Sequence, residues 1–135
     1  KVDYEYTLNI AKKSLDAGAK SISLVSAIGA NSDSTSFYLK TKGELEEEIK
    51  KLPFETINIF QPGHLAGRIN WQREKNDPRI DVFAFELASL FLDPLMIGDL
   101  KKYRSINANK LAKFIIKESK KNIKGINYYQ YMDFC

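Results

Sequence analysis

The chain contains three polar residues whose types and spacing suit proton transfer: Ser26, Tyr38 and Lys42. Tyr38 and Lys42 stand four residues apart, which places them on the same face of a helix. A free tyrosine, with a pKa of about 10, is a poor base at neutral pH, but a neighbouring ammonium favours the phenolate. We therefore expect Tyr38 to be an acid or base toward a hydroxyl or carbonyl, Lys42 to activate it and Ser26 to hold the substrate oxygen.

Side chains do not supply a hydride, so redox chemistry at these residues would require a nicotinamide cofactor. Each residue also has an ordinary structural explanation. Tyr38 is typical of a half-buried helix aromatic, Lys42 of a solvated helix charge and Ser26 of a residue that ends a strand. Because Tyr-x-x-x-Lys is too short to be specific by itself, the hypothesis depends on the elements that place the three residues.

Helical and strand patterns alternate along the chain. The helical spacing of apolar residues and the capping signals predict helices over 3–17 with Gly18 as cap, over 36–51 with Ser34 or Thr35 as cap, and from Asn107 or Asn109 to about 121. Alternating polar and apolar residues predict a strand over 21–25, and short segments next to turn residues predict strands over 55–60 and 126–131. This order predicts an α/β fold with a doubly wound parallel sheet and helices on both sides. Ser26 would then lie at the end of the first strand, where such sheets bind ligands.

The composition is that of one soluble domain spanning residues 1–135, with 44% hydrophobic and 28% charged residues. The net charge of +4 comes from lysines spread along the helices, so we expect no nucleic-acid partner. No apolar run is long enough to span a bilayer, and one histidine with one cysteine makes a metal site unexpected. These features lead us to expect a cytoplasmic protein without a membrane partner.

Four stretches of the sequence resemble one known family. They are 24–30 (LVSAIGA), 37–46 (FYLKTKGELE), 60–65 (FQPGHL) and, more loosely, 103–106 (YRSI). On these stretches the chain resembles the atypical short-chain dehydrogenase/reductases, an NAD(P)-binding Rossmann family that includes Tat-interacting-protein-like oxidoreductases and proteins similar to NAD-dependent epimerases and dehydratases. The resemblance implies a Rossmann-type domain of which this chain is the C-terminal part, with the N-terminal βαβ units missing. We expect such a fragment to be unstable and inactive by itself.

The resemblance also implies roles for individual residues. Tyr38 matches the catalytic acid/base, Lys42 the residue that activates it and contacts the nicotinamide ribose, and Ser26 the donor to the substrate oxygen. The residues matching positions that contact the cofactor are Lys42, Pro62, Gly63, His64, Leu65 and Arg73. Two positions depart from the family pattern: Ala27 stands where a second serine is common, and Gln61 stands where arginine is usual.

The functional expectation is an NAD(P)H-dependent oxidoreductase that acts on a carbonyl or alcohol substrate through Ser26, Tyr38 and Lys42. The alternative is a non-catalytic NAD(P)-binding regulator or scaffold. The expected cofactor is NADP or NAD, and the resemblance favours NADP. The expected substrate is a small molecule. The protein could also form a homodimer. Two other features have plain explanations: His64 suits loop packing, and the apolar run 82–92 suits a core segment, with a substrate pocket or subunit interface as alternatives.

Overall fold

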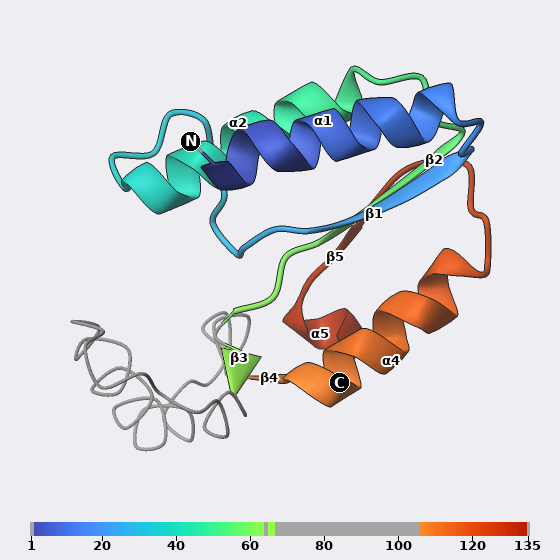
Figure 1. The fold of residues 1–135 in the computed structure, drawn as a ribbon. Coiled ribbons are helices and arrows are strands. Elements are labelled where there is room, and N and C mark those ends of the chain that lie inside the picture. Colours follow the sequence, from blue (N-terminus) through green and yellow to red (C-terminus); the bar gives the residue numbers. More distant parts are fainter. Residues whose placement is uncertain (1, 64, 67–105, 135) are drawn as a thin grey trace, which may run out of the picture.

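The computed structural model describes residues 2–63, 65–66 and 106–134 (Figure 1). Its main sheet consists of β1 (Ser21–Val25), β2 (Thr56–Phe60) and β5 (Gly125–Tyr129), in the order β1-β2-β5. Both pairings are parallel and in matching register, so Val25, Phe60 and Tyr129 lie side by side at the carboxyl ends. Two short strands, β3 (Leu65–Ala66) and β4 (Ile106–Asn107), form a second parallel pair. The predicted α/β fold with a parallel sheet is confirmed in these ranges.

Two helices cover one face of the main sheet, α1 (Val2–Asp16) and α2 (Phe37–Lys50) (Figure 1). Successive strand residues point to opposite faces, so Ile57 and Ile59 of β2 face these helices. They pack with Leu24 of β1 against Ala11 of α1 and Ile49 of α2, and all five side chains are buried. This core fixes α2, and therefore Tyr38 and Lys42, above β1 and β2.

The opposite face of the sheet is covered by α4 (Ala108–Ser119) and α5 (Tyr131–Phe134) (Figure 1). Phe60, the last residue of β2, is fully buried on this side and stacks on Tyr129 with ring centroids 4.9 Å apart. The Phe114 ring lies edge-on to the rings of Phe60, Tyr129 and Phe134, and the Phe134 ring is tilted against Phe60. These four rings form an aromatic cluster. Helices therefore lie on both faces of the sheet, as the alternating pattern predicted.

Capping residues set most helix boundaries where the sequence indicated. Gly18 has φ +89°, and its N–H donates to the Leu15 carbonyl at 2.9 Å, which ends α1 as predicted. Asn107 caps α4 because its side chain accepts a hydrogen bond from the Asn109 N–H at 2.9 Å. The cap of α2 differs: Ser36 is the capping position, and its side chain makes no capping bond.

The predicted third strand extended two residues too far. β5 ends at Tyr129, and Tyr131 opens the short helix α5. The Asp133 carboxylate accepts from the Gln130 N–H at 2.7 Å, while the Asp133 N–H donates to the Gln130 carbonyl at 2.9 Å. This reciprocal pair nucleates a helical turn where the aromatic residues alone had indicated a strand.

Tyr129 gives the fold a predictable response to alkaline pH. Burial, followed by the neighbouring Glu118 carboxylate, raises the pKa of Tyr129 above its ordinary value of 10.0. As pH rises, the phenol therefore loses its proton in the unfolded chain before it does so in the folded protein. The contribution of Tyr129 to the free energy of unfolding is complete below the ordinary pKa and is lost as pH rises through the folded pKa. We expect Tyr129→Phe to reduce the loss of stability above about pH 10 in urea unfolding series. An unchanged dependence on pH would contradict this assignment.

Candidate functional site

The candidate site lies at the carboxyl ends of β1 and β2. Beyond the strands, the two backbones stay paired for a short distance: the Ser26 N–H donates to the Phe60 carbonyl at 2.7 Å, and the Ile28 N–H to the Pro62 carbonyl at 2.9 Å. They then part, because β1 leads to α2 on one face while β2 leads to β3, beside α4 (Figure 1). In open α/β sheets, ligands usually bind outside the carboxyl ends of the strands, so this edge of the sheet is the candidate ligand position.

Ser26 is the most unusual residue at this position. Its side chain is 5% exposed, and its Oγ has no hydrogen-bond partner among the described residues. A buried hydroxyl left without a partner costs about 1–3 kcal/mol, so each such group requires an explanation. Its place at the carboxyl end of β1 supplies one, because the hydroxyl can both donate and accept a hydrogen bond with a bound molecule.

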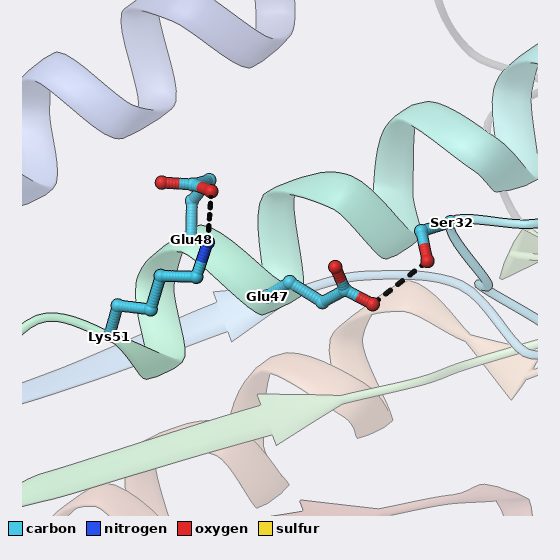
Figure 2. A network of polar contacts seen from close by, with 4 residues as sticks. All are labelled: Ser32, Glu47, Glu48 and Lys51. Atoms are coloured by element: carbon cyan, nitrogen blue, oxygen red, sulfur yellow. Dashed lines mark hydrogen bonds and ion pairs between the residues drawn. The ribbon is translucent and has the colours of Figure 1, made fainter.

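The loop that follows Ser26 is fastened along α2. The Asn31 N–H donates to the Leu39 carbonyl at 3.1 Å, and the Ser32 hydroxyl donates to the Glu47 carboxylate at 2.8 Å, a contact drawn in Figure 2. Gly43 allows the loop to approach, since a Cβ there would lie 2.3 Å from the Asn31 carbonyl carbon. The loop therefore has little freedom to move away from the helix.

The same close-up shows side chains at the C-terminal end of α2. Lys51 caps the helix through its backbone N–H, which donates to the Glu48 carbonyl at 3.2 Å, and its ammonium pairs with the Glu48 carboxylate at 2.6 Å (Figure 2). This pair raises the pKa of Lys51 above its ordinary value. Both side chains are solvated, so the ion pair closes the helix end and lies outside the candidate site.

Tyr38 and Lys42 meet as predicted. The Lys42 ammonium lies over the Tyr38 ring, 5.8 Å from its centroid, because helix side chains lean toward the N-terminus. Tyr38 is 58% exposed, however, and the buried Ser26 hydroxyl bonds to neither residue. The structure thus brings two of the three predicted catalytic residues together and leaves the third without a hydrogen bond to them. The catalytic roles of all three stay predictions.

A chain of polar side chains, of which Glu46 and Gln61 are buried and Gln130 is half-buried, lies next to these strand ends. The Gln61 amide donates to both carboxylate oxygens of Glu46, at 3.0 and 3.2 Å, and accepts from the Gln130 amide at 3.0 Å. Glu46 and Gln61 are 5% and 8% exposed. Sequence reasoning noted Gln61 as a departure from a pattern and Glu46 as the last residue of the 37–46 stretch, but it assigned neither a role and did not single out Gln130. One signal for Glu46 was available in the sequence: it follows Lys42 by one helical turn and so lies on the same face of α2.

The other predicted cofactor contacts are only partly within the described residues. Pro62 is buried and Gly63 half-buried directly after Gln61, and Leu65 lies in β3. His64, Arg73 and the apolar run 82–92 lie outside the described residues. The cofactor roles of these residues and of Lys42 stay predictions.

Three further findings concern the rest of the described chain. A cavity of 290 Å³ lies at the opposite, amino end of the sheet, lined by Lys20, Ser21, Glu55, Thr56, Asn122 and Lys124. Glu55 pairs there with both lysines at 3.5 Å, which lowers the pKa of its carboxyl. In ranges 2–63, 65–66 and 106–134, neither a helix able to cross a membrane nor a cluster of three metal-ligating side chains occurs.

Curated relatives of the chain are fungal proteins named Protein FMP52, mitochondrial. The Candida albicans protein is 46% identical over 67 residues, which is 50% of this chain and 29% of the relative. The Emericella nidulans protein is 40% identical over 90 residues, or 67% and 37% of the two chains. The Lodderomyces elongisporus protein is 33% identical over 124 residues, or 92% and 49%. The chain therefore spans less than half the length of these relatives.

These comparisons correct the functional expectations from the sequence. No protein-family model matches the chain. The resemblance to short-chain dehydrogenase/reductases is therefore wrong as an assignment, and the oxidoreductase function and its non-catalytic alternative lose their basis, because the relatives carry the FMP52 name. The expected cytoplasmic location is also wrong, since those relatives are named as mitochondrial proteins.

Proposed function

We propose that this chain is part of a mitochondrial protein in which a Rossmann-type sheet binds a dinucleotide, NADP or NAD, at the carboxyl ends of its strands, next to Ser26. The parallel sheet, the helices on both faces and the diverging connections after Ser26 and Pro62 support this proposal. The names of the relatives, which are called mitochondrial, support the proposed location. Ser26, Lys42, Pro62 and Gly63 are the described residues proposed to lie nearest the ligand.

The free edge of β1 suits a larger Rossmann sheet. Within the described residues, β1 pairs only with β2, and its sequence, Ser-Ile-Ser-Leu-Val, has neither the lysine nor the proline that commonly protects an exposed edge. We propose that further parallel strands pair with this edge in the full-length protein. The turn after one of them would hold the dinucleotide pyrophosphate at a helix N-terminus.

The buried Ser26 hydroxyl carries the proposal. Among the described residues it is the buried side-chain polar atom without a partner, and it lies at the strand end where the two connections separate. A structural serine with this burial would normally bond to a nearby carbonyl. A ligand amide, hydroxyl or carbonyl group can complete its hydrogen bonding, and a dinucleotide offers all three.

Ser26→Ala tests this role through two effects of opposite sign. Removing an unpaired buried hydroxyl is expected to stabilise the free protein by about 1 kcal/mol, because its desolvation is no longer uncompensated. The same change is expected to weaken dinucleotide binding about tenfold, through the loss of one hydrogen bond in a buried site. Thermal unfolding and titration calorimetry of the full-length protein with NADPH and NADH measure the two effects.

Ser23→Ala is the matched control on the same strand. The Ser23 hydroxyl lies toward α4, where it shares a 2.7 Å hydrogen bond with Ser119, so its removal should leave dinucleotide affinity unchanged. The proposal fails if neither dinucleotide binds the full-length protein. It also fails if Ser26→Ala binds as tightly as the original sequence.

A further inference from the structure

We propose that Gln61 is a positioning residue, which holds the Pro62–Gly63 turn in the shape that the ligand site requires. The Glu46–Gln61–Gln130 chain joins three elements, because Glu46 belongs to α2 while Gln61 and Gln130 directly follow β2 and β5. Gln61 is its central member and bonds to both neighbours through one amide group. This inference takes only the identity of the ligand from the proposed function.

The backbone of Gln61 is held as firmly as its side chain. The Gln61 N–H donates to the Tyr129 carbonyl at 2.8 Å, which continues the pairing of β2 with β5 by one residue. At the next residue, the Pro62 carbonyl accepts from the Ile28 N–H at 2.9 Å. Gln61 therefore lies between a fixed strand end and the turn that faces the loop after Ser26, and its side-chain bonds to Glu46 and Gln130 tie the start of that turn to two further elements.

The chemistry of the pair explains why an amide is suited to this position. Glu46 is a buried carboxylate, and the two amide donor distances of 3.0 and 3.2 Å place one NH₂ group across both of its oxygens. Gln61 must at the same time accept a hydrogen bond from Gln130. An amide side chain has both a donor and an acceptor end, so Gln61 satisfies both neighbours, and its orientation is fixed by them.

Exchanging the two side chains provides a direct test in the full-length protein. Gln61→Glu places two acidic groups against each other, and we expect it to weaken NADPH or NADH binding about tenfold because the turn is displaced. The double variant E46Q/Q61E restores an amide facing a carboxylate, and the new carboxylate can still accept from Gln130. We expect the double variant to recover affinity to within about threefold of the original sequence.

Hydrogen exchange at the Ile28 amide gives a readout that needs no ligand. Its bond to the Pro62 carbonyl reports the position of the turn. We expect faster exchange in Gln61→Glu and recovery in the double variant. If neither dinucleotide binds the original protein but exchange follows this pattern, the proposed function fails and the positioning role stands. Unchanged exchange in Gln61→Glu, or a folded double variant no better than Gln61→Glu, overturns the positioning role.

Discussion

Replacing Gly43 with alanine is expected to destabilise the protein by about 2–3 kcal/mol, although the same change in most helices is stabilising. The added Cβ would lie 2.3 Å from the Asn31 carbonyl carbon and 2.4 Å from the Ser32 nitrogen. Both contacts are with backbone atoms, so no side-chain rotation can relieve them. The loop must lift away from α2, which breaks the bond from Asn31 to the Leu39 carbonyl.

Urea unfolding of Gly43→Ala, compared with Lys40→Ala, measures this effect. Lys40 is an exposed residue one turn earlier on α2, and its replacement by alanine should change stability by less than about 0.5 kcal/mol. The packing between loop and helix is misassigned if Gly43→Ala is neutral or stabilising. Dinucleotide affinity should also fall in Gly43→Ala, because the displaced loop begins at Ser26.

The strand and helix pattern of this chain could be predicted well because it depends on short-range signals. The alternation in Ser21–Val25 and the Thr-Ile-Asn-Ile-Phe segment that ends at the Pro62–Gly63 turn each define a strand without knowledge of the partner strand. Gly18 and Asn107 are local stop and start signals of the same kind. The end of β5 could not be predicted in this way, because Asp133 redirects the chain through hydrogen bonds to Gln130 that aromatic content does not reveal.

The candidate site was predictable only in part. The spacing of Tyr38 and Lys42 is sufficient to place their side chains together on α2. The hydrogen bond between Gln61 and Glu46 joins residues 15 positions apart, and the one between Gln61 and Gln130 joins residues 69 positions apart. Both therefore depend on how the elements pack around the sheet. The missing partner of the Ser26 hydroxyl is likewise a property of the packed structure, since any serine after a strand has the same sequence signature.

The family resemblance failed for a related reason. Its strongest stretches, around Tyr38–Lys42 and Pro62–Gly63, are short, and short motifs also match unrelated proteins by chance. Such stretches describe a local arrangement that different proteins share. The arrangement is present in this structure, as the positions of Tyr38, Lys42 and Pro62 show, but it does not determine which reaction, if any, the protein catalyses.

Phe60→Ala is expected to cause the largest single loss of stability, about 3–5 kcal/mol, because it empties the centre of the aromatic cluster. Phe60 is fully buried, stacks on Tyr129 at 4.9 Å and meets Phe114 edge-on at 6.2 Å. Its ring also separates the sheet from α5, where Phe134 lies 6.5 Å away. The cavity cannot close easily, since β2 is held between two strands and cannot shift toward α4.

Phe37→Ala is the matched control for this deletion. Phe37 begins α2 and is 75% exposed, so the same chemical change there should alter the free energy of unfolding by less than about 0.5 kcal/mol. Phe60→Leu, which keeps most of the apolar volume, should lose only about 1–1.5 kcal/mol and covers the case in which Phe60→Ala does not fold. Equal losses in Phe60→Leu and Phe37→Ala, measured by urea unfolding, would contradict the central role of the Phe60 ring.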